Sequence, residues 1–192
     1  MERRSIETEI RFDTQHGFSG YAARFYDGTP GTQHEILPGL FERIDPKAFQ
    51  SITRDVVALY NHDSNLPLAR VSAKSLKLRV DRDGLRFDMK YNSADADHRR
   101  LKQKVEGGII KGCSFGFNIR EAEFMQDNGQ DVHLIRDADL IEVSPCVFPA
   151  YSETSLSFRN TEHIRQLQDQ YEAWKRTQER LERIKKFSKE AK

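Results

Sequence analysis

Apolar and polar residues alternate along residues 76–91, and this alternation limits the possible fold more than any other feature of the chain. Leu76, Leu78 and Val80 alternate with polar residues, and the pattern resumes in "LRFDMKY" after the turn "DRDG". Successive side chains of a strand point to opposite faces. The pattern therefore predicts a β-hairpin with one buried face.

Other segments of residues 1–160 also have strand character. They are "GFSGYAARFY", "DVVALYNHD", "CSFGFNIREAEF" and "DVHLIRDADLIEVS". Two short helices are expected, one in "DPKAFQSI" with Asp45 as N-cap and one in "SADADHRRLKQKVEGG" with Ser93 as N-cap and Gly107 at its end. Strands and helices do not alternate regularly, which argues against a doubly wound parallel sheet. The expected fold is mainly β with peripheral α-helices, as an antiparallel sheet or barrel.

Residues 161–192 differ in composition from the rest of the chain. They contain nine Lys or Arg and six Asp or Glu, whereas residues 1–160 contain 22 and 24. Seven apolar residues follow a helical spacing: Ile164, Leu167, Tyr171, Trp174, Leu181, Ile184 and Phe187. We therefore expect a domain over 1–160 and a charged amphipathic helix over 161–192, with a boundary near Asn160. Packing on its own domain and binding a partner are equally good roles for the helix.

The overall composition excludes several classes of protein. Lys plus Arg number 31 and Asp plus Glu 30, so the net charge gives no electrostatic case for nucleic acid or membrane binding. Cys113 and Cys146 form no disulfide framework and lack metal-ligand spacing. The start "MERRSIETEI" is not a signal peptide, and no apolar run has transmembrane length. We expect a soluble intracellular protein that acts without a metal or organic cofactor.

Residues 111–117, "KGCSFGF", place Ser114 in the pattern G-x-S-x-G. In a strand Cys113, Phe115 and Phe117 share the core face, whereas Ser114 and Gly116 face the other way. The hydroxyl would then be exposed beside open space, where a peptide substrate fits. Ser114 is either a nucleophile or a solvent-facing serine beside bulge glycines. The elbow of α/β-hydrolases is disfavoured, because a strand and not a helix follows the serine.

A nucleophilic serine needs a base and a group that orients the base. His62 is the first choice as base, because it ends the apolar run "DVVALY" where a buried strand emerges. Glu142 is an acid within the apolar segment "LIEVSP", and a buried carboxylate requires a partner. Pairing with His62 would satisfy Glu142, and the alternative is an arginine such as Arg70 or Arg79.

Six segments in order resemble the prohead (capsid maturation) serine proteases of tailed bacteriophages, which are related in fold to the herpesvirus assemblins. They are "GFSGYAARF", "LPGLFERIDPKAF", "VVALYNHD", "VDRDGLRFDMKY", "GGIIKGCSFGF" and "DLIEVSPCVFPAY". The resemblance covers roughly residues 17–151 and implies an assemblin-type β-barrel. It implies Ser114 as nucleophile, His62 as base and Glu142 as the group that orients His62. Assemblins use a second histidine there, so His133 competes with Glu142.

The resemblance also implies substrates and partners. The expected substrates are the scaffolding segment of the major capsid protein precursor, a scaffolding protein and the protease itself, within the prohead in the bacterial host cytoplasm. The helix over 161–192 is then expected to bind scaffold helices and to be removed by self-cleavage. Two other functions stay open: a catalytically inactive capsid scaffold with the same fold, and an unrelated serine esterase.

Overall fold

A computed structural model describes residues 1–6, 10–50, 52, 54–147 and 161–190. The strands are β1 (Glu2–Ile6), β2 (Arg11–Asp13), β3 (Gly17–Arg24), β4 (His34–Leu37), β5 (Leu40–Ile44), β6 (Val57–Tyr60), β7 (Asp63–Arg70), β8 (Leu76–Val80), β9 (Gly84–Met89), β10 (Gly112–Asp127) and β11 (Gln130–Cys146). The helices are α1 (Ala96–Glu106) and α2 (Thr161–Glu190), with a 3₁₀ turn η1 at Pro30–Thr32. Contacts group the chain into two units, Met1–Glu153 and Thr154–Lys192.

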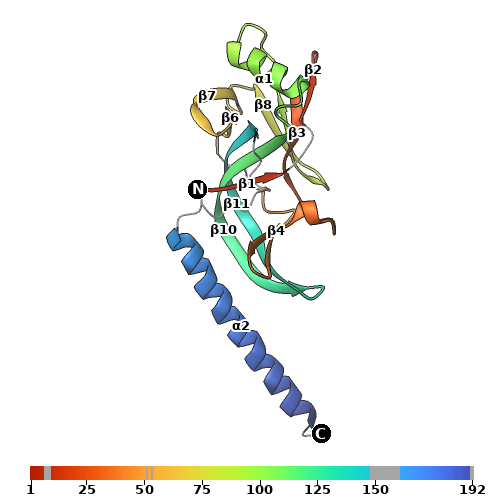
Figure 1. The fold of residues 1–192 in the computed structure, drawn as a ribbon, viewed down its shortest axis with the longest axis vertical. Coiled ribbons are helices and arrows are strands. Elements are labelled where there is room, and N and C mark those ends of the chain that lie inside the picture. Colours follow the sequence, from red (N-terminus) through yellow and green to blue (C-terminus); the bar gives the residue numbers. More distant parts are fainter. Residues whose placement is uncertain (7–9, 51, 53, 148–160, 191–192) are drawn as a thin grey trace. The chain divides into compact units, whose positions relative to one another are not determined.

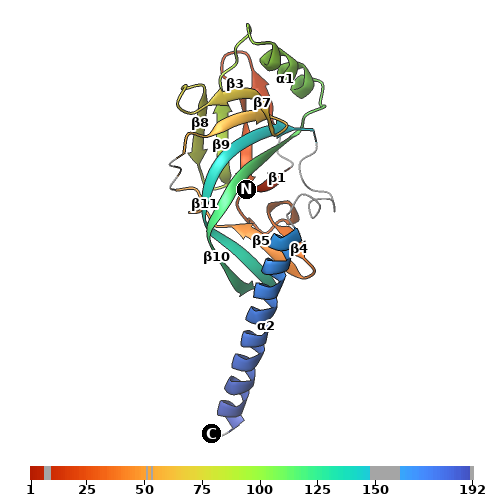
Figure 2. The same ribbon diagram turned by 90° about the vertical axis from the view of Figure 1, so that its left-hand side faces the viewer.

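The strands of the first unit form two sheets (Figure 1, Figure 2). The larger has seven strands in the order β1-β10-β11-β5-β4, with β6 paired to β11 and to β7. The smaller has the order β2-β3-β9-β8. The mainly β fold with two helices confirms the predicted class. The described strands do not close into a barrel, and β11 pairs in parallel with β5 and β6, so the larger sheet is mixed.

β10 and β11 are two long antiparallel strands that run side by side across the domain (Figure 1). The turn between them contains Asn128 and Gly129, both with positive φ, as expected for a two-residue hairpin turn. Cys113, Phe115 and Phe117 all lie in the hydrophobic core, which confirms the predicted core face of β10. This arrangement directs Ser114 to the opposite face of the sheet.

The predicted hairpin over residues 76–91 is formed by β8 and β9. Its buried face is continued by β3, and Phe18, Leu85 and Phe87 are fully buried. Val80 lies at the exposed edge of the sheet. A Cβ atom on Gly84 would lie 2.1 Å from the carbonyl oxygen of Ala23, so the close pairing of β9 with β3 requires glycine there.

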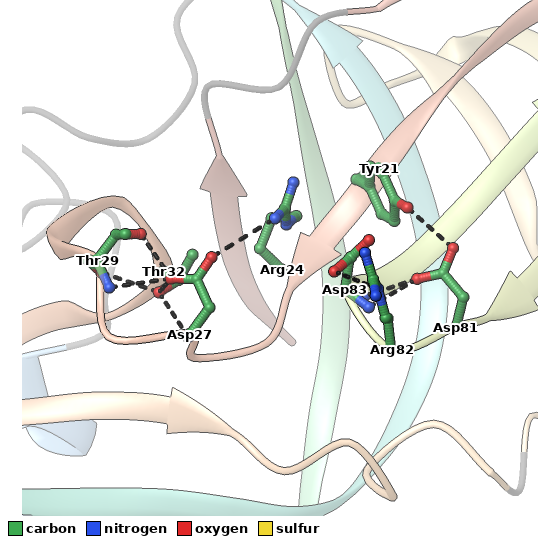
Figure 3. A network of polar contacts seen from close by, with 9 residues as sticks. Tyr21, Arg24, Asp27, Thr29, Thr32, Asp81, Arg82 and Asp83 are labelled. Atoms are coloured by element: carbon green, nitrogen blue, oxygen red, sulfur yellow. Dashed lines mark hydrogen bonds and ion pairs between the residues drawn. The ribbon is translucent and has the colours of Figure 1, made fainter.

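Side-chain carboxylates stabilise two turns of this sheet (Figure 3). Asp81 Oδ1 accepts hydrogen bonds from the backbone N–H groups of Asp83 and Gly84, at 2.9 and 3.1 Å. The Tyr21 hydroxyl donates to Asp81 Oδ2 at 2.9 Å, which ties β3 to the β8–β9 turn. Asp27 Oδ1 accepts a hydrogen bond from the Thr29 hydroxyl at 2.7 Å, within the turn that leads to η1.

The helix predicted in "DPKAFQSI" is wrong, because residues 46–50 form turns. Asp45 caps the first turn by accepting a hydrogen bond from the Lys47 N–H at 2.8 Å. The backbone groups then bond to β11: Asp45 N donates to Ile135 O, and Ala48 O accepts from Ala138 N. These bonds to the sheet replace the continuation of a helix.

The second predicted helix exists as α1, with a different N-cap. Asp95 accepts hydrogen bonds from the N–H groups of Asp97 and His98, so the helix begins after Asp95 and not after Ser93. Gly107 is the C-cap, as predicted. Asp95 forms the cap because its carboxylate reaches the orphan N–H groups at the second and third helical positions.

The second unit contains the helix α2. Leu181, Ile184 and Phe187 of its C-terminal half are exposed. The boundary predicted near Asn160 lies outside the described residues. In the described part of the chain, no helix is both long and apolar enough to span a membrane.

Candidate active site

Ser114 lies between β1 and β11, in the middle of three antiparallel strands. It is paired with Ser5 of β1 and with Ser144 of β11. Its side chain is fully buried, and its hydroxyl donates to the carbonyl oxygen of Arg4 at 2.8 Å. The expectation of an exposed hydroxyl is therefore wrong, because a strand that was not predicted, β1, pairs with β10 and supplies the carbonyl that the hydroxyl binds.

His62 lies in the tight turn between β6 and β7. Asn61 and His62 both have positive φ, 54° and 63°, which is a backbone region that residues other than glycine rarely adopt. The Asn61 N–H donates to Pro145 O at 3.0 Å, which holds the turn against β11. Positive φ at both central residues is the geometry of a two-residue hairpin turn, and here the turn places the imidazole beside Glu142.

Glu142 is almost completely buried and has two side-chain partners. His62 Nδ1 lies 2.6 Å from Glu142 Oε1, and the Ser144 hydroxyl donates to Oε2 at 2.5 Å. The space for this carboxylate exists because residue 116 is glycine: a Cβ on Gly116 would lie 2.6 Å from Oε1. A buried carboxylate with both oxygens hydrogen-bonded is adequately compensated.

The alternative partners of Glu142 are engaged elsewhere. Arg70 pairs with Asp55 at 2.9 Å, and Arg79 pairs with Asp88 at 2.7 Å. The alternative of an arginine partner is therefore wrong. The pairing of Glu142 with His62 is the one that the structure contains.

The contact with Glu142 determines which nitrogen of His62 carries a proton. An ionised carboxylate accepts hydrogen bonds only, so Nδ1 of His62 is the donor. A neutral imidazole protonated at Nδ1 has its lone pair on Nε2. That tautomer is the one that a general base requires.

Ser114, Glu142 and Ser144 share one face of the β10–β11 pair. Ser114 is opposite Ser144, and Gly116 is opposite Glu142, and directly paired residues project to the same face. In the described residues the Ser114 hydroxyl bonds to Arg4 and not to His62. The structure thus brings His62 and Glu142 together and holds Ser114 on the same face with a different partner.

His133 lies in another environment. Its Nδ1 is 3.6 Å from Glu42 Oε2, and its ring packs against Phe124 with the ring centroids 5.1 Å apart. Glu42 also binds the guanidinium of Arg4. The geometry therefore favours Glu142 over His133 as the partner of His62.

Three further features bear on the chemistry. Burial is the main cause that raises the pKa of the Cys113 thiol well above its ordinary value, and this cysteine lies in the core, as its parity with Phe115 and Phe117 predicted. Gly112, next to Cys113 and Ser114, is not among the described residues with positive φ, so it does not use the left-handed region that glycine favours. The described residues contain no group of three or more His, Cys, Asp or Glu side chains that would hold a metal ion.

Ser144, Arg4 and Glu42 were not among the residues predicted for the site. Ser144 shares parity with Glu142 in "LIEVSP", so a strand reading of that segment places both side chains on one face. Arg4 and Glu42 are 38 residues apart and meet only because β1 and β5 belong to the same sheet. Nothing in the local sequence indicates their pairing.

Comparison with known proteins identifies the family of the chain. A model of the caudovirus prohead serine proteases matches residues 2–168. The chain belongs to this family. The resemblance to prohead proteases stated from the sequence is thus confirmed.

A curated member of the prohead protease family is similar as well. The prohead protease of Escherichia phage T5 is 24% identical over 110 residues, which are 57% of this chain and 49% of the relative. The chain therefore matches about half the length of that prohead protease. No solved structure matches the chain.

Proposed function

We propose that this chain is a serine endopeptidase of phage capsid maturation, with Ser114 as nucleophile, His62 as general base and Glu142 as the residue that orients His62. The observation that carries the proposal is the 2.6 Å contact between His62 Nδ1 and Glu142, on the face of the sheet that also holds Ser114. The family supports protease activity. On this proposal the domain has an assemblin-type fold.

The reaction is acyl transfer in two steps. Ser114 Oγ forms a bond to the carbonyl carbon of the scissile peptide, while His62 Nε2 takes the hydroxyl proton. His62 then gives that proton to the leaving nitrogen as the carbon–nitrogen bond breaks. A water molecule next attacks the acyl carbon, losing a proton to His62, and Ser114 recovers the proton as the product acid leaves.

Glu142 and the backbone support the charges that develop in these steps. The carboxylate of Glu142 stabilises the imidazolium that forms on His62, and Ser144 holds the second carboxylate oxygen. Backbone amides beside Ser114 are the expected donors to the oxyanion. Each donor of this kind contributes about 3 kcal/mol in serine proteases.

The proposed substrates are capsid-assembly proteins. They are the scaffolding segment of the major capsid protein or a separate scaffolding protein, and the protease itself, inside the prohead in the host cytoplasm. Support comes from the family and from the T5 relative, which is named a prohead protease. Cleavage of a co-expressed capsid precursor, lost in Ser114→Ala, tests this part of the proposal.

The catalytic assignment is tested by labelling with a small fluorophosphonate, followed by intact mass spectrometry. We expect one adduct on the parent and none on Ser114→Ala, with strongly slowed labelling of His62→Ala. Ser93→Ala, which alters an exposed serine, serves as the control and labels like the parent. An adduct that persists in Ser114→Ala would contradict the assignment of the nucleophile.

A catalytically inactive capsid scaffold is the second candidate function. The observation in its favour is that Ser114 is fully buried and hydrogen-bonded to Arg4. A folded chain that supports prohead assembly, with no Ser114-dependent cleavage of the capsid precursor, would favour this function. Turnover of small esters without any effect on capsid proteins would favour an unrelated esterase.

A further inference from the structure

β1 lies along β10 as an extended peptide substrate would. The two strands are antiparallel, and Ser5 is paired with Ser114. The Ser114 hydroxyl donates to the carbonyl oxygen of Arg4 at 2.8 Å. The peptide bond between Arg4 and Ser5 is therefore the one that faces the proposed nucleophile. Addition of a strand to a sheet edge is a common way for a protein to bind an extended peptide.

The side chain of Arg4 is bonded to a buried glutamate, Glu42. Its Nε and Nη2 bond to the two carboxylate oxygens of Glu42, the latter at 2.8 Å. The guanidinium also lies over the ring of Phe117, 5.6 Å from the centroid. Both Arg4 and Glu42 are buried, at 7% and 2% exposure. A fork of two parallel hydrogen bonds fits arginine, whereas a lysine ammonium cannot reproduce it.

Glu42 therefore has the properties of a specificity-determining residue. It is a buried carboxylate on β5 whose charge is compensated by an arginine from the strand that covers Ser114. Arg4 supplies two parallel charge-assisted hydrogen bonds to this carboxylate, which also lies 3.6 Å from His133 Nδ1. A peptide without arginine at that position loses both of these bonds and is expected to bind more weakly.

We infer that the edge of β10, together with Glu42, is the substrate site for an extended peptide with arginine immediately before the scissile bond. In this structure β1 occupies that site, with Arg4 in the place of the substrate arginine. The inference rests on the proposed function, because it takes Ser114 as the nucleophile. It adds the substrate class and the residue that selects it.

The test uses three peptidyl phosphonate esters that differ only at the residue before the phosphonate: arginine, lysine or alanine. Each forms an adduct with an activated serine, and intact mass spectrometry gives the rate of adduct formation on the full chain. We expect the arginine probe to react about 30-fold or more faster than the alanine probe. The lysine probe is expected to lie between them.

Two variants separate the role of Glu42 from other effects. Glu42→Gln alone would leave the buried Arg4 without its charged partner and could destabilise the fold. The double variant Arg4→Met with Glu42→Gln avoids this, because it removes both charges. In the double variant the ratio of the arginine and alanine rates is expected to fall to about one. Glu121→Gln, which alters an exposed glutamate of β10, keeps the ratio of the parent. The ratio of the arginine and alanine rates is informative, because any change in how readily β1 leaves β10 affects both rates equally.

Arg4→Met alone tests the occupation of the site by β1. Without the guanidinium, β1 loses its bonds to Glu42, so the arginine probe is expected to react about tenfold faster than with the parent. An unchanged or lower rate in folded Arg4→Met would show that β1 does not compete with the probe. That result would overturn the inferred position of the substrate.

The remaining outcomes distinguish this inference from the proposed function. If the small fluorophosphonate labels Ser114 while the arginine and alanine probes react equally with the parent, Glu42 does not select arginine. The assignment of Ser114 as the nucleophile of a protease then still stands. A preference for arginine that survives in the double variant also overturns the role of Glu42. If neither reagent labels Ser114 in Arg4→Met, the proposed function and the inference both fail.

Discussion

At the scale of single residues, the carboxylate of Glu142 is the centre of the site. It accepts hydrogen bonds from His62 and from Ser144 through different oxygens. On the proposed mechanism Ser144 is a positioning residue that acts through Glu142. Its hydroxyl is then expected to keep the carboxylate from rotating away from the imidazole.

Ser144→Ala tests that role. A hydrogen bond to a charged group contributes about 1.5–3 kcal/mol, so labelling of Ser114 by the fluorophosphonate is expected to slow by roughly 10-fold or more. Ser144→Thr, which retains a hydroxyl, is expected to recover part of the rate. A rate equal to that of the parent in Ser144→Ala, or no recovery in a folded Ser144→Thr, would contradict the role.

The three proposed catalytic residues are expected to differ in their importance. Ser114→Ala and His62→Ala remove bond formation and proton transfer, and each is expected to lower cleavage of the capsid precursor by a factor on the order of 10⁴ or more. Glu142→Ala is expected to cost less, because His62 still accepts a proton. Rates of precursor cleavage measured side by side give the order. Equal losses in Ser114→Ala and Glu142→Ala would show that Glu142 does more than orient the base.

At the scale of elements, the pairing of β10 with β11 makes room for the carboxylate at Gly116. A Cβ atom there would lie 2.6 Å from Glu142 Oε1 and 3.0 Å from Glu142 Cγ. Gly116→Ala is therefore expected to push Glu142 from His62 and to slow labelling of Ser114 about 10²-fold. The loss of unfolding free energy is expected to be about 1–3 kcal/mol, because the displaced atoms belong to a side chain.

Gly31→Ala is the matched control for Gly116→Ala. A Cβ atom at Gly31 meets nothing within 4 Å, and its φ is not positive. We expect its labelling rate and its urea midpoint to equal those of the parent. Normal labelling of Gly116→Ala would show that the position of Glu142 does not control the reaction.

The β8–β9 turn has a predicted dependence on pH. Burial acts to raise the pKa of Asp81, but hydrogen bonds from Asp83, Tyr21 and Gly84 hold it below its ordinary value of 3.8. Because the pKa is lower in the folded state, the stabilisation is present above about pH 4 and is lost as the pH falls.

The variant Asp81→Asn tests this dependence. Between pH 5 and pH 3 we expect the parent to lose more unfolding free energy than Asp81→Asn, as measured by urea denaturation at each pH. Tyr21→Phe removes one donor and is expected to reduce the loss in part. Equal losses in the parent and Asp81→Asn would show that this carboxylate does not contribute.

At the scale of the whole molecule, we predict that residues 161–192 bind a partner in the prohead. The helix α2 exposes Leu181, Ile184 and Phe187, which suit contact with a partner helix. A variant that ends at Asn160 is expected to enter proheads poorly, as measured by the protease content of purified particles, while Ser114 is still labelled. Normal incorporation of the shortened chain would contradict a role of this helix in binding scaffold.

Local sequence patterns were sufficient to predict the class of fold and several of its strands and helices. Alternation predicted the hairpin of β8 and β9 and the core face of β10, because side-chain direction in a strand depends only on parity. The segment "DPKAFQSI" was predicted wrongly, because its backbone bonds to β11, which is distant in sequence. Such long-range bonds leave no periodic signal.

The sequence by itself determined the mainly β class, the family and the candidates Ser114, His62 and Glu142, since these depend on residue types in a fixed order. Only the tertiary structure decided that His62 and not an arginine meets Glu142, and that β1 covers Ser114 with Arg4 bonded to Glu42. The physical reason is that these contacts join residues up to 110 positions apart. Their distances are set by strand pairing and register, which the local sequence does not encode.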